Sequence, residues 1–244
     1  MTITKEIGRL GNQIIRNIAV SIIAQKHNLL VNYCNNTSFI ELGIFLFIGT
    51  KIFENTILLT DTNYFNILNS NDLKYNLNPN ENYFQTKEIT NLIYEYLNSE
   101  PIKNNIIKNN KYKGRYNNNN DLFVHIRLDD MAHNNPGLYY YINTINGINY
   151  SDLYISTDSL NHSFILNLKQ RFPKLIIINS NEINTIQFAS TCKNIILSHG
   201  SFSAVIGYLS FFSQIYYPEY ESGKIWYGDM FSINNWNKCS IKIT

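Results

Sequence analysis

The sequence predicts an α/β protein of 244 residues with a doubly wound parallel sheet in its second half. Short apolar runs in that half alternate with segments of helical spacing, and strands that are separated by one helix each pair in parallel. Near the start of the chain, a glycine-containing turn joins a predicted strand to an amphipathic helix. Because ligands of such layers bind at the carboxyl ends of the strands, functional residues are expected there.

The first half opens with a predicted short strand at residues 2–7, which is followed by a helix. The apolar residues of this helix recur at helical spacing at Leu10, Ile14, Ile18 and Ile22. Gly8 and Gly11 are predicted to lie in the turn before it, where glycine permits a positive φ and a close approach of the backbone to a ligand. Free N–H groups at the start of a helix favour anionic partners. Loop geometry alone also explains two glycines, and the motif by itself favours that explanation.

The rest of the first half gives weaker patterns. Strands are predicted at 29–33 and 56–59, and a helix at 86–97. From residue 102 to 120 the hydrophobic periodicity is lost and asparagine, lysine and glycine are frequent, which is typical of a linker or a long surface loop. We therefore predict two domains, residues 1–115 and residues 116–244.

The second half gives the clearer pattern. Strands are predicted at 122–126, 153–156, 175–178, 195–197 and 214–217. Helices are predicted at 160–171, 183–192 and 202–212. If the first half is a smaller version of the same layer, the molecule consists of two lobes that face each other across a cleft.

Composition narrows the classes of function. A hydrophobic fraction of 44% predicts a globular chain, and a net charge of +2 with 16% charged residues lacks the concentrated basic footprint of a nucleic-acid-binding protein. Cys34, Cys192 and Cys239 are few and widely spaced, which fits a reducing compartment and neither a disulfide framework nor a metal cluster. The most hydrophobic run, 42–49, is too short to span a bilayer, and no signal peptide is recognised. We expect a soluble cytoplasmic protein without a membrane segment of its own; attachment through a partner stays open.

The first candidate site lies at the end of the strand at 122–126. His125 and Arg127 alternate with apolar residues, so their side chains project to the same side of the sheet. The planar guanidinium of Arg127 suits phosphate oxygens, and His125 can donate or accept a hydrogen bond. Asp129 and Asp130 follow and are candidates to orient Arg127 or to take a proton from a hydroxyl group. A surface ion pair with a capping aspartate explains the same residues equally well.

Two further motifs stand where strands give way to helices. Asp158 ends the run Ser156-Thr157-Asp158, where its carboxylate either caps the next helix or accepts hydrogen bonds from a ribose or a base. Residues 198–204 follow the strand at 195–197 and begin a helix. Glycine and serines at that position expose N–H groups and hydroxyls that suit an anion such as pyrophosphate. A serine N-cap without a ligand is the alternative.

Taken together and in this order, the motifs resemble those of the GDP-fucose-dependent fucosyltransferases, particularly the alpha-1,2-fucosyltransferases of glycosyltransferase family 11. The family's Gly-Gly-Leu-Gly-Asn-Gln is matched by Gly8-Arg9-Leu10-Gly11-Asn12-Gln13. Its His-x-Arg-Arg-x-Asp is matched at His125, Arg127 and Asp130, and Leu128 stands in place of the second arginine. Ser156-Thr157-Asp158 and Ser201-Phe202-Ser203 match two later motifs, with Ala204 and Val205 in place of tryptophans.

The resemblance implies a GT-B-like fold of two Rossmann-like lobes, with a small N-terminal lobe on the acceptor side and the nucleotide sugar in the C-terminal lobe. It implies an inverting transfer of fucose from GDP-fucose to a sugar hydroxyl of a glycan, with no cofactor and no metal. The residues implied in donor binding are Gly8, Gly11, Asn12, Arg127, Asp158, Gly200, Ser201, Phe202 and Ser203. Those implied in catalysis are Arg127, His125, Asp129 and Asp130.

Several alternatives stay open at this point. The proton of the acceptor hydroxyl goes to Asp129, to Asp130 or to the departing diphosphate. The donor is GDP-fucose or another nucleotide-deoxysugar. The changes at Leu128 and at the tryptophans also fit a catalytically inactive relative that binds a nucleotide or a glycan, and a structural or assembly protein is a third hypothesis. Trp226 and Tyr227 can stack on an acceptor sugar, although packing of the C-terminal segment explains them more simply.

Overall fold

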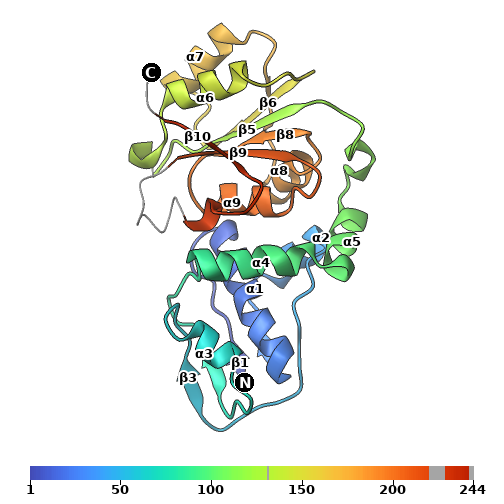
Figure 1. The fold of residues 1–244 in the computed structure, drawn as a ribbon, viewed down its shortest axis with the longest axis vertical. Helices are drawn as coiled ribbons and strands as arrows, with labels where there is room; N and C mark the ends of the chain where they lie inside the picture. Colours follow the sequence, from blue (N-terminus) through green and yellow to red (C-terminus); the bar gives the residue numbers. More distant parts are fainter. Residues whose placement is uncertain (131, 220–228, 242–244) are drawn as a thin grey trace. The chain divides into compact units, whose positions relative to one another are not determined.

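The computed structural model describes residues 1–130, 132–219 and 229–241 (Figure 1). Contacts within the chain divide it into two compact units, Met1–Asn109 and Asn110–Thr244. Each unit is described by itself.

The unit Met1–Asn109 combines helices with two short pairs of parallel strands. Its elements are β1 (Thr2–Ile3), α1 (Leu10–His27), β2 (Val31–Asn32), α2 (Asn36–Leu42), β3 (Thr56–Leu58), α3 (Tyr64–Leu68), β4 (Asn76–Asn78), α4 (Lys87–Asn98) and α5 (Glu100–Asn109). β1 pairs with β2 and β3 pairs with β4. The buried hydroxyl oxygen of Thr2 accepts a hydrogen bond from the Leu77 N–H at 2.8 Å, so a side chain links the two pairs. The strands predicted at 2–7, 29–33 and 56–59 are present in the structure as the shorter strands β1, β2 and β3.

The helix α1 is buried on more sides than an amphipathic pattern predicts. Its apolar residues Ile14, Ile15 and Ile18 are buried, and Arg16 is only 1% exposed. The Arg16 guanidinium donates hydrogen bonds to the main-chain oxygens of Asn80 and Asn82. Because a buried guanidinium needs such acceptors, Arg16 fixes the loop between β4 and α4 onto this helix.

The predicted linker or surface loop at 102–120 is wrong in part: the boundary between the two units, after Asn109, does fall within it, but much of it is helical. Helix α5 fills its first part, and a 3-10 helix, Lys113–Arg115, follows. Asn119 donates from its amide to the main-chain oxygens of Arg115 and Thr191 at 2.7 and 2.9 Å, and its side-chain oxygen accepts from the Asp121 N–H at 3.1 Å. Asparagine amides order this stretch through hydrogen bonds, which a search for hydrophobic periodicity does not detect.

The unit Asn110–Thr244 contains a six-stranded parallel sheet. Its strands are β5 (Leu122–Ile126), β6 (Leu153–Thr157), β7 (Ile176–Ile177), β8 (Asn194–Ile196), β9 (Gln214–Pro218) and β10 (Asn237–Cys239). They lie in the order β10-β9-β8-β5-β6-β7, and all pairs are parallel. This is the strand order of a Rossmann fold, so the prediction of a doubly wound α/β layer is confirmed.

Helices cover both faces of the sheet. They are α6 (Leu138–Asn146), α7 (Ser163–Arg171), α8 (Glu182–Ala189) and α9 (Ser201–Tyr208). Figure 1 shows α6 and α7 on one face and α8 and α9 on the other. Because the strand order reverses at β5 and β8, the helices that follow these two strands leave on opposite faces. A crevice at the carboxyl ends of β5 and β8 is the expected ligand position of such a fold.

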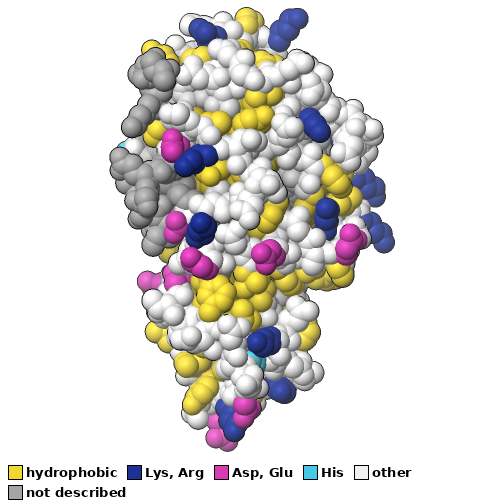
Figure 2. Space-filling model, viewed as in Figure 1, with side chains coloured by type: hydrophobic (Ala, Val, Ile, Leu, Met, Phe, Trp, Pro, Cys, Tyr) yellow, Lys and Arg dark blue, Asp and Glu magenta, His cyan; other side chains and the backbone are white. Residues whose placement is uncertain are grey.

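Charge is dispersed over the surface that Figure 2 draws. Lysine and arginine side chains are interspersed there with aspartate and glutamate, and they do not gather into one basic area on that face. The helices within the described ranges all fall short of the length or the apolar composition that crossing a bilayer requires.

Candidate functional site

The switch point between β5 and β8 brings together residues of two predicted motifs. β5 and β8 pair side by side, with Val124 opposite Ile196. His125 is buried, and its Nδ1 lies 2.6 Å from the Ser203 hydroxyl oxygen, which also accepts the Ser198 N–H at 3.1 Å. The histidine at the end of β5 is thus joined to the first turn of α9.

Arg127 extends over the start of α9. A Cβ atom placed on Gly200 would lie 2.8 Å from Nη1 of Arg127, so the guanidinium rests against the bare backbone of this glycine. Nη2 donates to both carboxylate oxygens of Asp130, at 3.0 and 3.2 Å. Nε is buried and has no hydrogen-bond partner among the described residues. Nε can therefore donate a hydrogen bond to a further acceptor, such as a ligand oxygen, near the start of α9.

The start of α9 has the geometry of an anion site. Its N-cap is Gly200, with φ 86° and ψ 167°, which has no side chain that could accept a hydrogen bond from the first N–H groups of the helix. The first N–H groups of a helix have no partner within the helix, and the helix dipole makes this end positive. The alternative of a serine N-cap is wrong, because Ser201 and Ser203 lie inside the helix. The Phe202 ring packs on His125, with ring centroids 5.2 Å apart.

Both histidines of the site are held in the neutral form. Burial is the main cause, and the neighbouring His199 and Arg127 are lesser ones, of a pKa of about 3 for His125. Burial also lowers the pKa of His199 to about 4, with Arg127 as a second cause. At neutral pH, His125 and His199 thus offer hydrogen bonds without charge, and Arg127 supplies the positive charge.

These pKa values predict how stability depends on pH. An unfolded histidine has a pKa of about 6.5, so between about pH 4 and 6.5 the unfolded chain binds protons that the folded chain does not. The free energy of unfolding should therefore rise with pH across this window, by about 1.4 kcal/mol per pH unit for each histidine, and level off above it. Urea unfolding of the wild type and of His125→Gln at several pH values measures the slope, which should be smaller in the variant. Equal slopes would contradict a buried, neutral His125.

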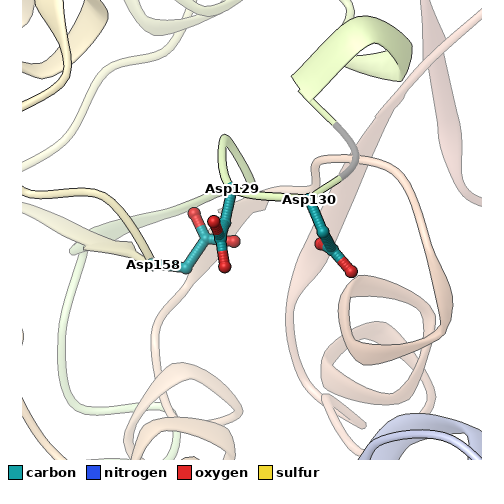
Figure 3. A group of neighbouring side chains, drawn as sticks. All are labelled: Asp129, Asp130 and Asp158. Atoms are coloured by element: carbon teal, nitrogen blue, oxygen red, sulfur yellow. The ribbon is translucent and has the colours of Figure 1, made fainter.

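Three exposed carboxylates gather beside this site. Asp129 and Asp130 follow β5 and Asp158 follows β6, and one oxygen of each lies within 4.8 Å of the others (Figure 3). Asp158 accepts the Leu128 N–H at 2.8 Å, and Asp130 is bound to Arg127. Asp158 does not cap the next helix, because the N-cap of α7 is His162. Carboxylates in such a group could hold a divalent cation, but Asp130 and Asp158 already accept hydrogen bonds from Arg127 and Leu128.

Leu128 does not face the site. Its side chain is 4% exposed and belongs to the hydrophobic core with Ile126 and Ile165. Ala204 and Val205, which stand in place of the family's tryptophans, are likewise fully buried. In this chain, the position of the missing second arginine is therefore a core position.

The predicted residues near the N-terminus lie in the other unit. Gly8 has a φ of 73°, as a turn glycine requires, but Gly11 lies within α1 rather than in the turn. The Asn12 side-chain oxygen accepts a hydrogen bond from the Gln85 amide at 2.8 Å. Gln13 donates to the main-chain oxygen of Gly8 at 2.8 Å. A role of Gly8, Gly11 and Asn12 in donor binding stays a prediction, and Trp226 and Tyr227 lie outside the described residues.

Sequence reasoning missed α6 and the residues that it brings to the switch point. Tyr140 donates from its hydroxyl to the main-chain oxygen of Leu197 at 2.9 Å, and the Tyr141 hydroxyl lies 2.9 Å from Oγ of Ser198. The available signal was a run of tyrosines, 139–141, shortly after the aspartates, because buried tyrosine hydroxyls need partners.

Comparisons with known proteins give little beyond this geometry. The sequence matches no protein-family model and no curated protein. Among solved structures it is similar to an alpha-1,6-fucosyltransferase, NodZ, from a crystal soaked with GDP-fucose, with 16% sequence identity and a TM-score of 0.31. The similarity covers 51% of this chain and 47% of that chain, so the chain spans about half the length of this fucosyltransferase. With a similarity this weak, the case for a function depends on the switch point itself.

Proposed function

We propose that the chain is a glycosyltransferase that moves fucose from GDP-fucose to a sugar hydroxyl of a glycan, with inversion and without a metal, in the manner of the alpha-1,2-fucosyltransferases. The observation that carries the proposal is the convergence of Arg127 and the start of α9, whose N-cap is Gly200, at the switch point of a Rossmann-type sheet. A cation and a helix start that face one another suit the diphosphate of a nucleotide sugar.

In the proposed reaction, the bond between the sugar carbon and the diphosphate oxygen breaks, and GDP leaves with the electron pair. The acceptor oxygen forms the new bond to that carbon. Arg127 and the first N–H groups of α9 stabilise the negative charge that builds on the departing diphosphate. His125 is neutral and held by Ser203, so it contributes a hydrogen bond of fixed direction rather than a charge.

The proton of the acceptor hydroxyl goes to Asp129 or to the departing diphosphate. Asp130, whose carboxylate is bound to Arg127, is the third candidate. Asp158 is proposed to accept hydrogen bonds from the nucleoside. Residues 1–115 are proposed to carry the acceptor side, with Gly8, Gly11 and Asn12 contributing to donor binding.

The experiment that tests this function is calorimetric titration of the full chain with GDP, UDP and dTDP. We expect GDP to bind most tightly, and its Kd to be the same with EDTA and with Mg²⁺. A Kd that depends on Mg²⁺ would contradict a donor site that works without a metal. Binding of none of the three nucleotides would overturn the proposal. Incubation with GDP-fucose and candidate glycans, followed by mass spectrometry, then tests the transfer itself.

A further inference from the structure

A closed ring of hydrogen bonds surrounds the backbone of Arg127. The Arg127 N–H donates to Oγ of Ser198 at 3.3 Å, and that oxygen lies 2.9 Å from the Tyr141 hydroxyl. The Asn135 amide donates to the Tyr141 hydroxyl at 3.0 Å and to the main-chain oxygen of Arg127 at 2.9 Å. The main-chain N–H and C=O of Arg127 are therefore both hydrogen-bonded to side chains, and the hydrogen bonds form a closed ring that begins and ends at Arg127.

The ring joins three separate segments of the unit. Arg127 and Asn135 lie in the segment between β5 and α6, Tyr141 lies in α6, and Ser198 follows β8. Tyr141 is fully buried, and the neighbouring Tyr140 binds the Leu197 main-chain oxygen next to Ser198. A buried hydroxyl group without a hydrogen-bond partner lowers the stability of the fold. The two tyrosines therefore favour the one arrangement of the ends of β5 and β8 in which both hydroxyls have partners.

This arrangement determines where the guanidinium lies. Ser198 precedes Gly200 by two residues, and the Arg127 guanidinium rests against Gly200 at the start of α9. The ring therefore holds the Arg127 backbone on one side. On the other side it holds Ser198, and the chain runs from Ser198 through Gly200 into the first N–H groups of α9. We propose that Tyr141, together with Asn135 and Ser198, is a positioning residue that sets the distance between the Arg127 guanidinium and the first N–H groups of α9, and so the fit of a diphosphate between them. The inference rests on the proposed nucleotide site.

The test is a calorimetric comparison of Tyr141→Phe with the matched control Tyr139→Phe, which changes an exposed tyrosine of the same helix. Both variants are titrated with GDP and with guanosine. We expect Tyr141→Phe to weaken GDP binding about two- to tenfold, which is the effect of one hydrogen bond, and to leave guanosine binding unchanged. Tyr139→Phe should bind both as the wild type does. Equal losses for GDP and guanosine, or no loss for either, would overturn the proposal.

A double-mutant cycle with Arg127→Ala separates positioning from general loosening of the fold. If Tyr141 acts through Arg127, the double variant should lose no more GDP affinity than Arg127→Ala alone. Fully additive losses would mean that Tyr141 acts by another route. Should Tyr141→Phe not fold, Asn135→Ala opens the same ring at a half-buried position and replaces it in the cycle.

A measurement without nucleotide keeps this proposal distinct from the proposed function. If the wild type binds neither GDP nor guanosine, the proposed function is wrong. Amide hydrogen exchange still measures whether the hydrogen bonds of the ring protect the Arg127 amide. In Tyr141→Phe, the Arg127 amide should then exchange faster than in Tyr139→Phe, while the amides within β5 keep their protection. Unchanged exchange at Arg127 would overturn the positioning role.

Discussion

Arg127→Ala should weaken GDP binding roughly 10- to 150-fold, the range expected when a hydrogen-bonded charged group worth about 1.5 to 3 kcal/mol is lost. The guanidinium lies against Gly200, its Nε has no hydrogen-bond partner among the described residues, and the two histidines beside it are neutral. Its loss therefore removes the positive charge of this site at neutral pH. Calorimetric titration of the full chain with GDP measures the effect.

Two controls show whether the loss comes from the guanidinium. Asp130→Asn removes a carboxylate that Arg127 binds but leaves the guanidinium in place, so GDP affinity should not fall. Arg127→Lys keeps the charge without the planar group of donors and should fall between the wild type and Arg127→Ala. Unchanged GDP affinity in Arg127→Ala would remove this residue from the site and would leave the proposed function without its main support.

Five of the six strands described in the second unit could be predicted from the sequence because they are short apolar runs with clear ends, whereas β10 is a polar edge strand that the sequence analysis does not predict. The prediction of residues 122–126 coincides with β5, and those for β6 and β9 end within a residue of the strands. Their parallel pairing follows from the alternation of strands and helices, whereas the order of the strands in the sheet does not. His125 and Arg127 could be assigned to one side of β5 by the same reasoning, since side chains alternate along a strand.

The hydrogen-bonded parts of the molecule could not be predicted in this way. Asn119 and Arg16 hold loops through contacts with residues far away in sequence, and neither forms part of a periodic apolar pattern. Tyr141 and Asn135 reach the site through side-chain hydrogen bonds, which depend on how β5, α6 and β8 come together. The family motif assigns Leu128 to the site as a replaced arginine, whereas strand alternation beyond Arg127 places it on the core side, where the structure has it.

Gly200→Ala is the second substitution with a large expected effect, and Gly137→Ala is its matched control. Both glycines are N-caps with similar backbone angles, φ 86° and ψ 167° at Gly200 and φ 95° and ψ 156° at Gly137. This region is essentially restricted to glycine, so alanine should lower the free energy of unfolding by about 1 to 3 kcal/mol at either position. Urea unfolding measures this shared cost.

The two variants should differ in GDP binding. A Cβ atom at Gly200 would lie 2.8 Å from Nη1 of Arg127, whereas one at Gly137 meets nothing within 4 Å. In Gly200→Ala the guanidinium must move away from the start of α9, and GDP affinity should fall at least about tenfold, or 1.4 kcal/mol. In Gly137→Ala, where the N–H of residue 137 donates to Oδ1 of Asn135 at 2.9 Å but no side chain is displaced, GDP affinity should fall less than in Gly200→Ala. Equal losses would mean that backbone strain, and not the contact with Arg127, governs the nucleotide site. A loss of GDP affinity in Gly200→Ala alone would mean that nucleotide binding depends on the close approach of the Arg127 guanidinium to the start of α9.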